Sequence, residues 1–221
     1  MIWAVVVIVL ASIVLSYRAK KKRREALAAW SRQRGWQLTE SDDSYTKRFE
    51  GTPFGTGDNR QARNIMTGRA GDRSCVVFDY RYDTHSTDSK GNRTTSTHWF
   101  EIVAVSLPRT VPSLEVGREG VFGTMARAVG IKDIELENED FNRQFKVKSP
   151  DAKFAYDVLH PRMMQWLMES GFDRPWRIDG GEIMSWRNGR TKLERVDGSL
   201  TFLGAVIDRV PGFAWDREPQ P

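Results

Sequence analysis

The side chains best suited to chemistry in this sequence are three histidines, His85, His98 and His160, and one cysteine, Cys75. No histidine has the spacing to another histidine, or to Cys75, that zinc ligands usually show. Cys75 opens an apolar run, where a buried and unreactive thiol is the expected state. The sequence also lacks the Gly-x-Ser-x-Gly turn of many hydrolases. We therefore predict no catalytic residue, no metal site and no cofactor.

A group of positive charges gives one sharper hypothesis. The pair Asn188-Gly189 is typical of a two-residue turn in a β-hairpin. Such a turn places Arg187 opposite Arg190 and leaves Lys192 on the same face. Like charges directly opposed are unfavourable unless something neutralises them. We therefore predict that Arg187, Arg190 and Lys192 bind an anion, either a lipid phosphate or an acidic partner. Simple solvation of these charges is the alternative.

The positive charge of the chain is concentrated near its start. The 221 residues carry a formal charge of +5, and six basic residues lie between Arg18 and Arg24. Removing these six from the 34 Lys and Arg leaves 28 against 29 Asp and Glu, so the rest of the chain has a charge of −1. Nucleic-acid binding usually needs a basic surface on the folded domain itself. We therefore expect no nucleic-acid partner.

The first 17 residues predict a transmembrane anchor. Ile2 to Leu15 is apolar apart from Ser12, and a cleavable signal peptide is disfavoured because no positive charge precedes this run. Aromatic and basic side chains typically flank a membrane span. The residues assigned to this role are Trp3, Tyr17, Arg18, Lys20, Lys21, Lys22, Arg23 and Arg24.

The charge asymmetry around this segment predicts a location. Six Lys and Arg follow the apolar run and none precedes it, which by the positive-inside rule places the following chain in the cytoplasm. The sequence is thus interpreted as a single-pass protein of the cell membrane, with an extracytoplasmic domain as the alternative. The expected partners are the lipid bilayer and either anionic lipid headgroups or a protein.

Composition and helix-capping residues divide the rest of the chain into segments. Residues 18–35 form a basic juxtamembrane segment and a linker helix, which Gly35 can cap. Residues 36–214 form a soluble α+β domain, taken as a single domain, and residues 215–221 form a disordered tail. The 11% of aromatic residues predict a packed core for this domain.

Periodicity gives the elements of the domain. Alternating apolar positions and turn residues predict strands, whereas capping residues and prolines at first-turn positions predict helices. The predicted strands are 45–51, 62–69, 74–83, 95–107, 114–116, 141–148, 176–178, 182–187 and 190–196, with a mobile loop at 84–93. The predicted helices are 23–34, 120–129, 150–159, 161–169 and 199–210. This order indicates an α+β fold with a mainly antiparallel sheet and flanking helices behind the transmembrane helix.

Three segments are distinctive: FNRQFKVKSPDAKFAYDVLHPRMMQWL from Phe141 to Leu167, PFGTG from Pro53 to Gly57, and PWRI from Pro175 to Ile178. In these the chain resembles an uncharacterised family of bacterial membrane-anchored or secreted proteins. The resemblance implies an N-terminal anchor and a small α+β domain. It brings no functional residue, because the family has no established activity.

Taken together, the sequence predicts a membrane-tethered binding or scaffold domain without catalysis. A peripheral domain that binds anionic lipids is one alternative. An unrecognised membrane-tethered hydrolase, built from scattered Ser, Asp and His residues, is another.

Overall fold

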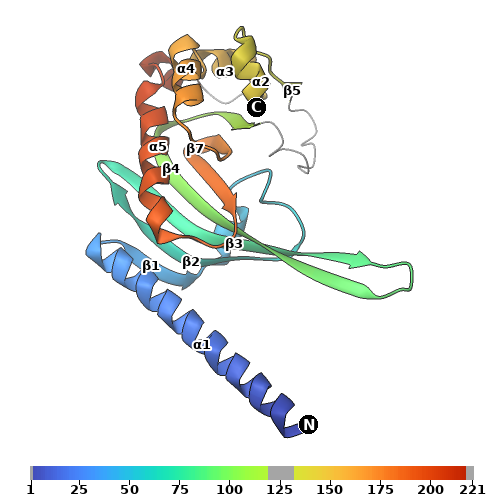
Figure 1. The fold of residues 1–221 in the computed structure, drawn as a ribbon. Coiled ribbons are helices and arrows are strands. Elements are labelled where there is room, and N and C mark those ends of the chain that lie inside the picture. The colour runs from blue at the N-terminus through green and yellow to red at the C-terminus, as the bar shows by residue number, and fades with distance from the viewer. Residues whose placement is uncertain (1, 119–131, 218–221) are drawn as a thin grey trace.

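One antiparallel sheet forms the centre of the molecule. The computed structural model describes residues 2–118 and 132–217, and in them seven strands lie in the order β1-β2-β3-β4-β6-β5, with β7 paired to β4 (Figure 1). The strands are β1 (Gln37–Ser41), β2 (Asp58–Ala70), β3 (Arg73–Thr87), β4 (Arg93–Arg118), β5 (Lys132–Asp133), β6 (Phe145–Ser149) and β7 (Trp176–Asn188). The sheet and its flanking helices agree with the α+β part of the prediction. The transmembrane helix in that prediction is wrong, for reasons given below.

The longest strand, β4, joins the two halves of the sheet. It pairs with β3 and then β6 along one edge, and with β7 along the other edge from Phe100 to Val116. Its pairing with β7 is irregular around Pro108 and Pro112. Proline has no N–H to donate, so it is tolerated in a strand where the regular hydrogen-bond ladder is already interrupted. One long strand therefore runs through both prolines, in place of the separate strands predicted at 95–107 and 114–116.

Helices α2 to α5 share one apolar cluster with the sheet, and the end of the N-terminal helix joins it (Figure 1). The cluster joins Val77 and Val103 of the sheet to Phe154, Leu167 and Leu203 of the helices. Helix α4 has the predicted bounds, and α3 begins two residues later than predicted because the side chain of Asp151 caps it. The helices are α2 (Glu139–Gln144), α3 (Ala152–Val158), α4 (Pro161–Glu169) and α5 (Leu193–Arg209).

The opposite face of the sheet is covered by the segment from Asp42 to Gly57. This segment begins with the 3-10 helix η1 (Asp43–Lys47), so the strand predicted at 45–51 is wrong. Its aromatic side chains lie on the aromatic face of β3: the ring centroids of Tyr45 and Phe78 are 5.3 Å apart, and those of Phe54 and Tyr80 are 4.5 Å apart. The apolar residues at 45–54 therefore cover a sheet face instead of forming another strand.

The N-terminal helix α1 (Ile2–Gln33) projects from the domain (Figure 1). Its last turns pack against the sheet through Leu27 and Trp30, and Gly35 follows it with a positive φ of 66°. Trp30 meets Trp36 edge to face, with ring centroids 5.3 Å apart. The predicted linker helix is thus the end of α1, docked on the domain.

Helix α1 corrects the predicted anchor. No helix in residues 2–118 and 132–217 is both long enough and apolar enough to cross a membrane. Crossing takes about 20 consecutive apolar residues, but α1 turns basic at Arg18. The prediction of a single-pass membrane protein is therefore wrong, and the argument for a cytoplasmic domain loses its basis, because it assumed a spanning helix. Tyr17 and the basic residues that follow it lie on α1, and the side chain of Trp3 lies outside the described part.

The segment after β7 also differs from its prediction. A single strand β7 replaces the two strands predicted at 176–178 and 182–187, because the chain keeps its pairing with β4 through Gly180, opposite an irregular part of β4. No hairpin forms at Asn188-Gly189. The chain instead turns over the sheet, and α5 begins at Leu193, in the segment predicted as strand 190–196.

Smaller differences have local causes. Residues 141–144 belong to helix α2, because Asn138 caps it by accepting a hydrogen bond from Phe141 N. Half of the predicted loop 84–93 is strand, and the other half, residues 88–92, forms a turn that Asp88 closes. Part of the predicted tail is structured: Gly212–Asp216 forms the 3-10 helix η2, and Arg217 pairs with Asp151. The helix predicted at 120–129 lies outside the described residues.

Gly198 offers a direct test of α5. It lies inside the helix and is exposed, and a Cβ added there would meet no atom within 4 Å. Gly198→Ala is expected to raise the free energy of unfolding by about 0.5–1 kcal/mol, measured by urea titration. Gly68→Ala is the contrasting variant, because its Cβ would lie 2.3 Å from the Trp36 ring. A lower stability for Gly198→Ala would contradict a helix at this position.

Candidate anion-binding site

The helix-covered face of the sheet changes from apolar to polar along β3 and β4. Val77 and Val103 are paired across the two strands, and Asp79 and Glu101 form the next pair on the same face. Two residues further, Arg81 pairs with Trp99. Two segments reach this polar half: the side chain of Arg23 from α1, and the backbone N–H of Thr191 just before α5.

Asp79 is the centre of the polar half. Its side chain is 0% exposed and accepts hydrogen bonds from Arg23 of α1, Asn64 of β2 and the backbone N–H of Thr191, at 3.0, 2.8 and 2.6 Å. A buried carboxylate is stable only with such partners. Asp79 therefore ties α1, β2 and the segment before α5 together.

Glu101, the cross-strand neighbour of Asp79, is bound in the same way. It accepts hydrogen bonds from Arg174 at 2.8 Å and from the backbone N–H of Lys192 at 2.8 Å. Arg174 also donates to Ser199 of α5 at 2.7 Å. Both buried carboxylates are thus engaged by fixed donors, an arrangement that holds the fold together.

The segment from Gly189 to Lys192 is attached to the sheet at three points. Gly189 N donates to Trp99 O at 2.7 Å, Thr191 N to Asp79 at 2.6 Å, and Lys192 N to Glu101 at 2.8 Å. Arg190 lies between these attachments, and its guanidinium carbon lies 4.1 Å from the centroid of the Trp99 ring. The guanidinium of Arg81 lies 5.6 Å from the same ring. Trp99 is half-buried and Arg190 is exposed.

The structure separates the three predicted anion-binding residues. Arg187 lies on β7 opposite Glu101 and forms an ion pair with Asp173 at 2.7 Å, so it does not oppose Arg190. Arg190 lies over Trp99, and the exposed Lys192 immediately precedes α5. Sequence reasoning missed Trp99 and Arg81. A signal was present, because a tryptophan two residues after the polar run TTST can lie at the polar end of a strand.

Hydrogen bonds also order the sheet next to this group. Asp83 accepts from Thr97 at 2.7 Å and from Asn59 at 2.7 Å, and it pairs with Arg81 at 3.0 Å. These contacts, first that with Thr97, lower the pKa of Asp83 below its ordinary value. The carboxylate therefore neutralises Arg81 and holds it beside Trp99.

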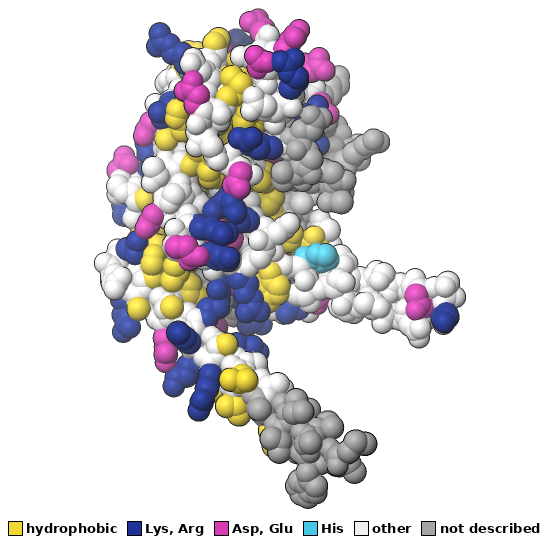
Figure 2. Space-filling model, in the orientation of Figure 1, with side chains coloured by type: hydrophobic (Ala, Val, Ile, Leu, Met, Phe, Trp, Pro, Cys, Tyr) yellow, Lys and Arg dark blue, Asp and Glu magenta, His cyan; other side chains and the backbone are white. Residues whose placement is uncertain are grey.

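The basic residues of α1 lie close to the same region. Arg18, Lys20, Lys21, Lys22 and Arg24 are exposed, whereas Arg23 is half-buried against Asp79. Figure 2 shows Lys and Arg side chains gathered on α1 and on the adjoining part of the domain. Because Asp79 binds both Arg23 and Thr191 N, one carboxylate connects the basic run to the Arg190 segment.

The other reactive residues have structural contacts. Cys75 is buried, and burial raises the pKa of its thiol. His98 contacts Thr84 at 2.9 Å, and His85 contacts Thr95 at 2.9 Å. His160 caps α4 through Met163 N. In residues 2–118 and 132–217 no group of His, Cys, Asp and Glu could hold a metal ion.

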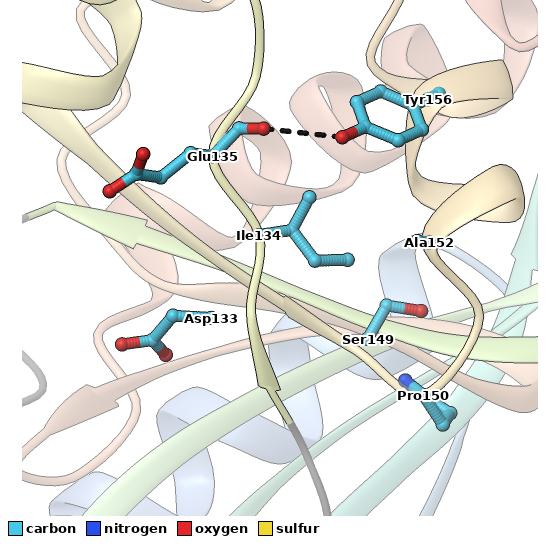
Figure 3. Close-up of a pocket in the computed structure, with 7 residues that line it drawn as sticks. All are labelled: Asp133, Ile134, Glu135, Ser149, Pro150, Ala152 and Tyr156. Atoms are coloured by element: carbon cyan, nitrogen blue, oxygen red, sulfur yellow. Dashed lines mark hydrogen bonds between the residues drawn. The ribbon is translucent and has the colours of Figure 1, made fainter.

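A pocket of about 350 Å³ lies between β5 and α3. Tyr156 donates a hydrogen bond to the backbone oxygen of Glu135 at 3.3 Å, and Ser149 donates to Ser113 O. The carboxylates of Asp133 and Glu135 point away from the Ser149 hydroxyl (Figure 3). No histidine lines the pocket, so this arrangement gives no support to the hydrolase alternative. Its lining residues are Asp133, Ile134, Glu135, Ser149, Pro150, Ala152 and Tyr156.

Comparison with known proteins gives one informative result. No family model matches the chain, and no curated protein matches it in sequence. Among solved structures, the crystal structure of the mycobacterial trehalose monomycolate transport factor A, TtfA, is similar, with a TM-score of 0.65 and 12% sequence identity. The similarity covers 90% of this chain and 97% of that one. At this identity it shows a shared fold.

Proposed function

We propose that this chain is a non-catalytic binding protein that associates peripherally with an anionic lipid surface and assists lipid transport. The observation that carries the proposal is the exposed part of α1, where a basic run follows apolar side chains on a projecting helix (Figures 1 and 2). The fold likeness to a transport factor supports the second half of the proposal.

The charge of α1 favours an anionic lipid surface over other partners. Five of the six basic residues from Arg18 to Arg24 are exposed, and no acidic residue precedes Glu25. Each Lys or Arg close to an anionic surface contributes about 1 kcal/mol of attraction. Ahead of this run, Leu10, Leu15 and Tyr17 are 56%, 65% and 68% exposed. Apolar side chains beside positive charge suit contact with a layer of lipid headgroups.

The likeness to TtfA adds a biological direction. That protein is a transport factor for trehalose monomycolate. From it we take only the general role, a protein that assists the movement of a lipid.

A protein scaffold is the second candidate. It is favoured by the hairpin arm, residues 84–97, in which β3 and β4 leave the domain as a polar ribbon (Figure 1). Within the described chain the strand residues of the arm pair along the backbone with each other and, at the base of the arm, Thr97 pairs with Asp83. Free strand edges can accept another chain. A protein partner that binds the arm would therefore support the scaffold over the lipid surface.

Co-sedimentation with vesicles tests the proposal. The full chain is mixed with phosphatidylglycerol vesicles and with phosphatidylcholine vesicles, and the ratio of the two affinities is measured. Neutralising the exposed basic residues of α1 is expected to reduce this ratio by about 100-fold or more, because five charges near the surface are lost. The substitutions are Arg18→Gln, Lys20→Gln, Lys21→Gln, Lys22→Gln and Arg24→Gln, combined in one variant.

A second variant controls for net charge. It removes five exposed basic residues from other parts of the surface, so that both variants lose the same charge. Its ratio is expected to remain within about threefold of the unmodified chain, since these residues lie outside α1. Equal losses in the two variants, or no preference of the unmodified chain for phosphatidylglycerol, would contradict the proposal. The control substitutions are Lys47→Gln, Lys90→Gln, Arg93→Gln, Lys153→Gln and Arg162→Gln.

A further inference from the structure

Arg190 is exposed, but backbone hydrogen bonds on both sides of it fix its position. The backbone of Gly189 and Thr191, on either side of it, is hydrogen-bonded to Trp99 O and Asp79, and Lys192 N is bonded to Glu101. Asp79 and Glu101 are themselves 0% and 2% exposed. A short segment held by buried carboxylates loses little freedom when its side chain binds a ligand. Arg190 is therefore preorganised.

Trp99 determines how the guanidinium of Arg190 is presented. The guanidinium carbon lies 4.1 Å from the indole centroid, within the range of a cation–π contact. Such a contact uses the face of the guanidinium, whereas its N–H groups lie in its plane and can form two parallel hydrogen bonds to an oxyanion. The contact with Trp99 thus leaves these donors available for an anion.

The charges around this point do not balance. Asp79, Asp83, Glu101 and Asp173 form ion pairs with Arg23, Arg81, Arg174 and Arg187, respectively. Arg190 and Lys192 are exposed. For neither of them does the described part of the chain provide an ion pair with an acidic side chain. The segment therefore presents two positive charges without an acidic partner, beside four arginines that are each paired with a carboxylate. An anion would complement these two charges.

We infer that Arg190, supported by Trp99 and Lys192, binds the phosphodiester of a phospholipid headgroup. The inference rests on the proposed function for the source of the phosphate. Its place in the fold favours a lipid: the Asp79 carboxylate that holds Thr191 N also holds Arg23 of the basic α1 run. The headgroup site and the basic helix therefore meet at one buried residue.

Titration with a water-soluble lipid tests this site apart from vesicle binding. The full chain, kept in an uncharged maltoside detergent, is titrated with dihexanoyl-phosphatidylglycerol by calorimetry. Separate titrations use inorganic phosphate and hexaglutamate. The indole N–H signal of Trp99 in a nitrogen-15 spectrum, assigned with Trp99→Phe, reports whether the ligand lies at this site. We expect saturable binding of the lipid, a shift of the Trp99 signal, and binding at least about tenfold weaker for phosphate and hexaglutamate.

Two variants decide the role of Arg190. Arg190→Gln is expected to weaken lipid binding at least about tenfold and to abolish the Trp99 shift, whereas Arg162→Gln, which removes an exposed charge on α4, leaves both unchanged. Circular dichroism verifies that both variants are folded. Unchanged lipid binding in Arg190→Gln would overturn the inference. If phosphate binds as tightly as the lipid, the site is one for free phosphate. If hexaglutamate binds more tightly than the lipid, the site is one for an acidic protein. Either result would also overturn the inference.

The outcome is separable from that of the proposed function. If the α1 variant loses its preference for anionic vesicles but still binds the soluble lipid through Arg190, both ideas hold. If the preference for anionic vesicles depends on α1 but Arg190→Gln leaves soluble-lipid binding unchanged, only the headgroup site is contradicted. If soluble-lipid binding depends on Arg190 but the unmodified chain shows no preference for anionic vesicles, only the surface association is contradicted.

Discussion

Asp79→Ala is expected to lower the free energy of unfolding by roughly 3–5 kcal/mol, the cost of breaking a buried ion pair by removing one partner. The Asp79 side chain is fully buried, and it accepts hydrogen bonds from three separate segments. Its loss leaves Arg23 half-buried without its carboxylate and Thr191 N without an acceptor. Urea titration followed by circular dichroism measures the effect.

Asp208→Ala is the matched control for this experiment. It removes the carboxylate of an ion pair with Arg73 in which Asp208 is 59% exposed. Exposed pairs of this kind contribute about 0–1 kcal/mol, so the control is expected to unfold nearly as the unmodified chain does. Equal stabilities for the two variants would mean that Asp79 does not hold the three segments together.

Arg177→Ala is expected to cost a similar amount, roughly 3–5 kcal/mol, and to release the segment that covers the aromatic face of the sheet. Arg177 is 5% exposed and pairs with Glu115 at 2.6 Å. It also donates to Thr52 O at 2.8 Å and to Glu50 O, and lies 4.9 Å from the Trp186 ring centroid. One side chain thus joins β4, β7 and the covering segment.

Limited trypsin digestion gives a local reading of this variant. Lys47 and Arg48 are exposed cleavage sites in the covering segment, and cleavage after them is expected to be faster in Arg177→Ala under conditions where the protein remains folded. Glu182→Ala is the control, because it removes only the more exposed pair with Arg48. It is expected to cost about 1 kcal/mol or less. The same digestion rate in both variants would show that Arg177 does not hold the segment.

Local patterns predicted the elements whose hydrogen bonds are local or whose apolar face is regular. Pro161 after His160 gave the start of α4 correctly, since proline fits the first helical turn. The alternation of Val76, Phe78 and Tyr80 correctly indicated β3. In both cases the residues that determine the structure lie within a few positions of each other.

The candidate site was found only in part, because long-range contacts determine its geometry. Asn188-Gly189 predicts a hairpin from local preference, but hydrogen bonds to Trp99, Asp79 and Glu101 draw the following segment across the sheet. Those acceptors lie about ninety or more positions earlier in the chain, so no local pattern contains them. Arg190 and Lys192 were selected for their charge, and the indole beneath Arg190 could be seen only in the fold.

The predicted anchor failed for a different reason. An apolar run next to Lys and Arg matches the pattern of a membrane flank, and Arg23 was assigned to it on this basis. In the structure Arg23 binds Asp79, a residue in the third strand. A basic residue in such a run can therefore flank a membrane or form a buried ion pair within the fold. The sequence of the run does not distinguish the two roles, because the carboxylate partner lies elsewhere in the chain.

The length of β4 has a consequence for synthesis of the chain. Its β3 partner is made before it, but the β7 edge waits for residues up to Asn188. At about 5–20 residues per second, translation from Arg118 to Asn188 takes several seconds or more. During this time the mainly apolar edge from Phe100 to Val116 lacks its native neighbour, and such edges readily pair with other chains. The nascent protein is therefore expected to depend on a chaperone that shields this strand until β7 emerges from the ribosome.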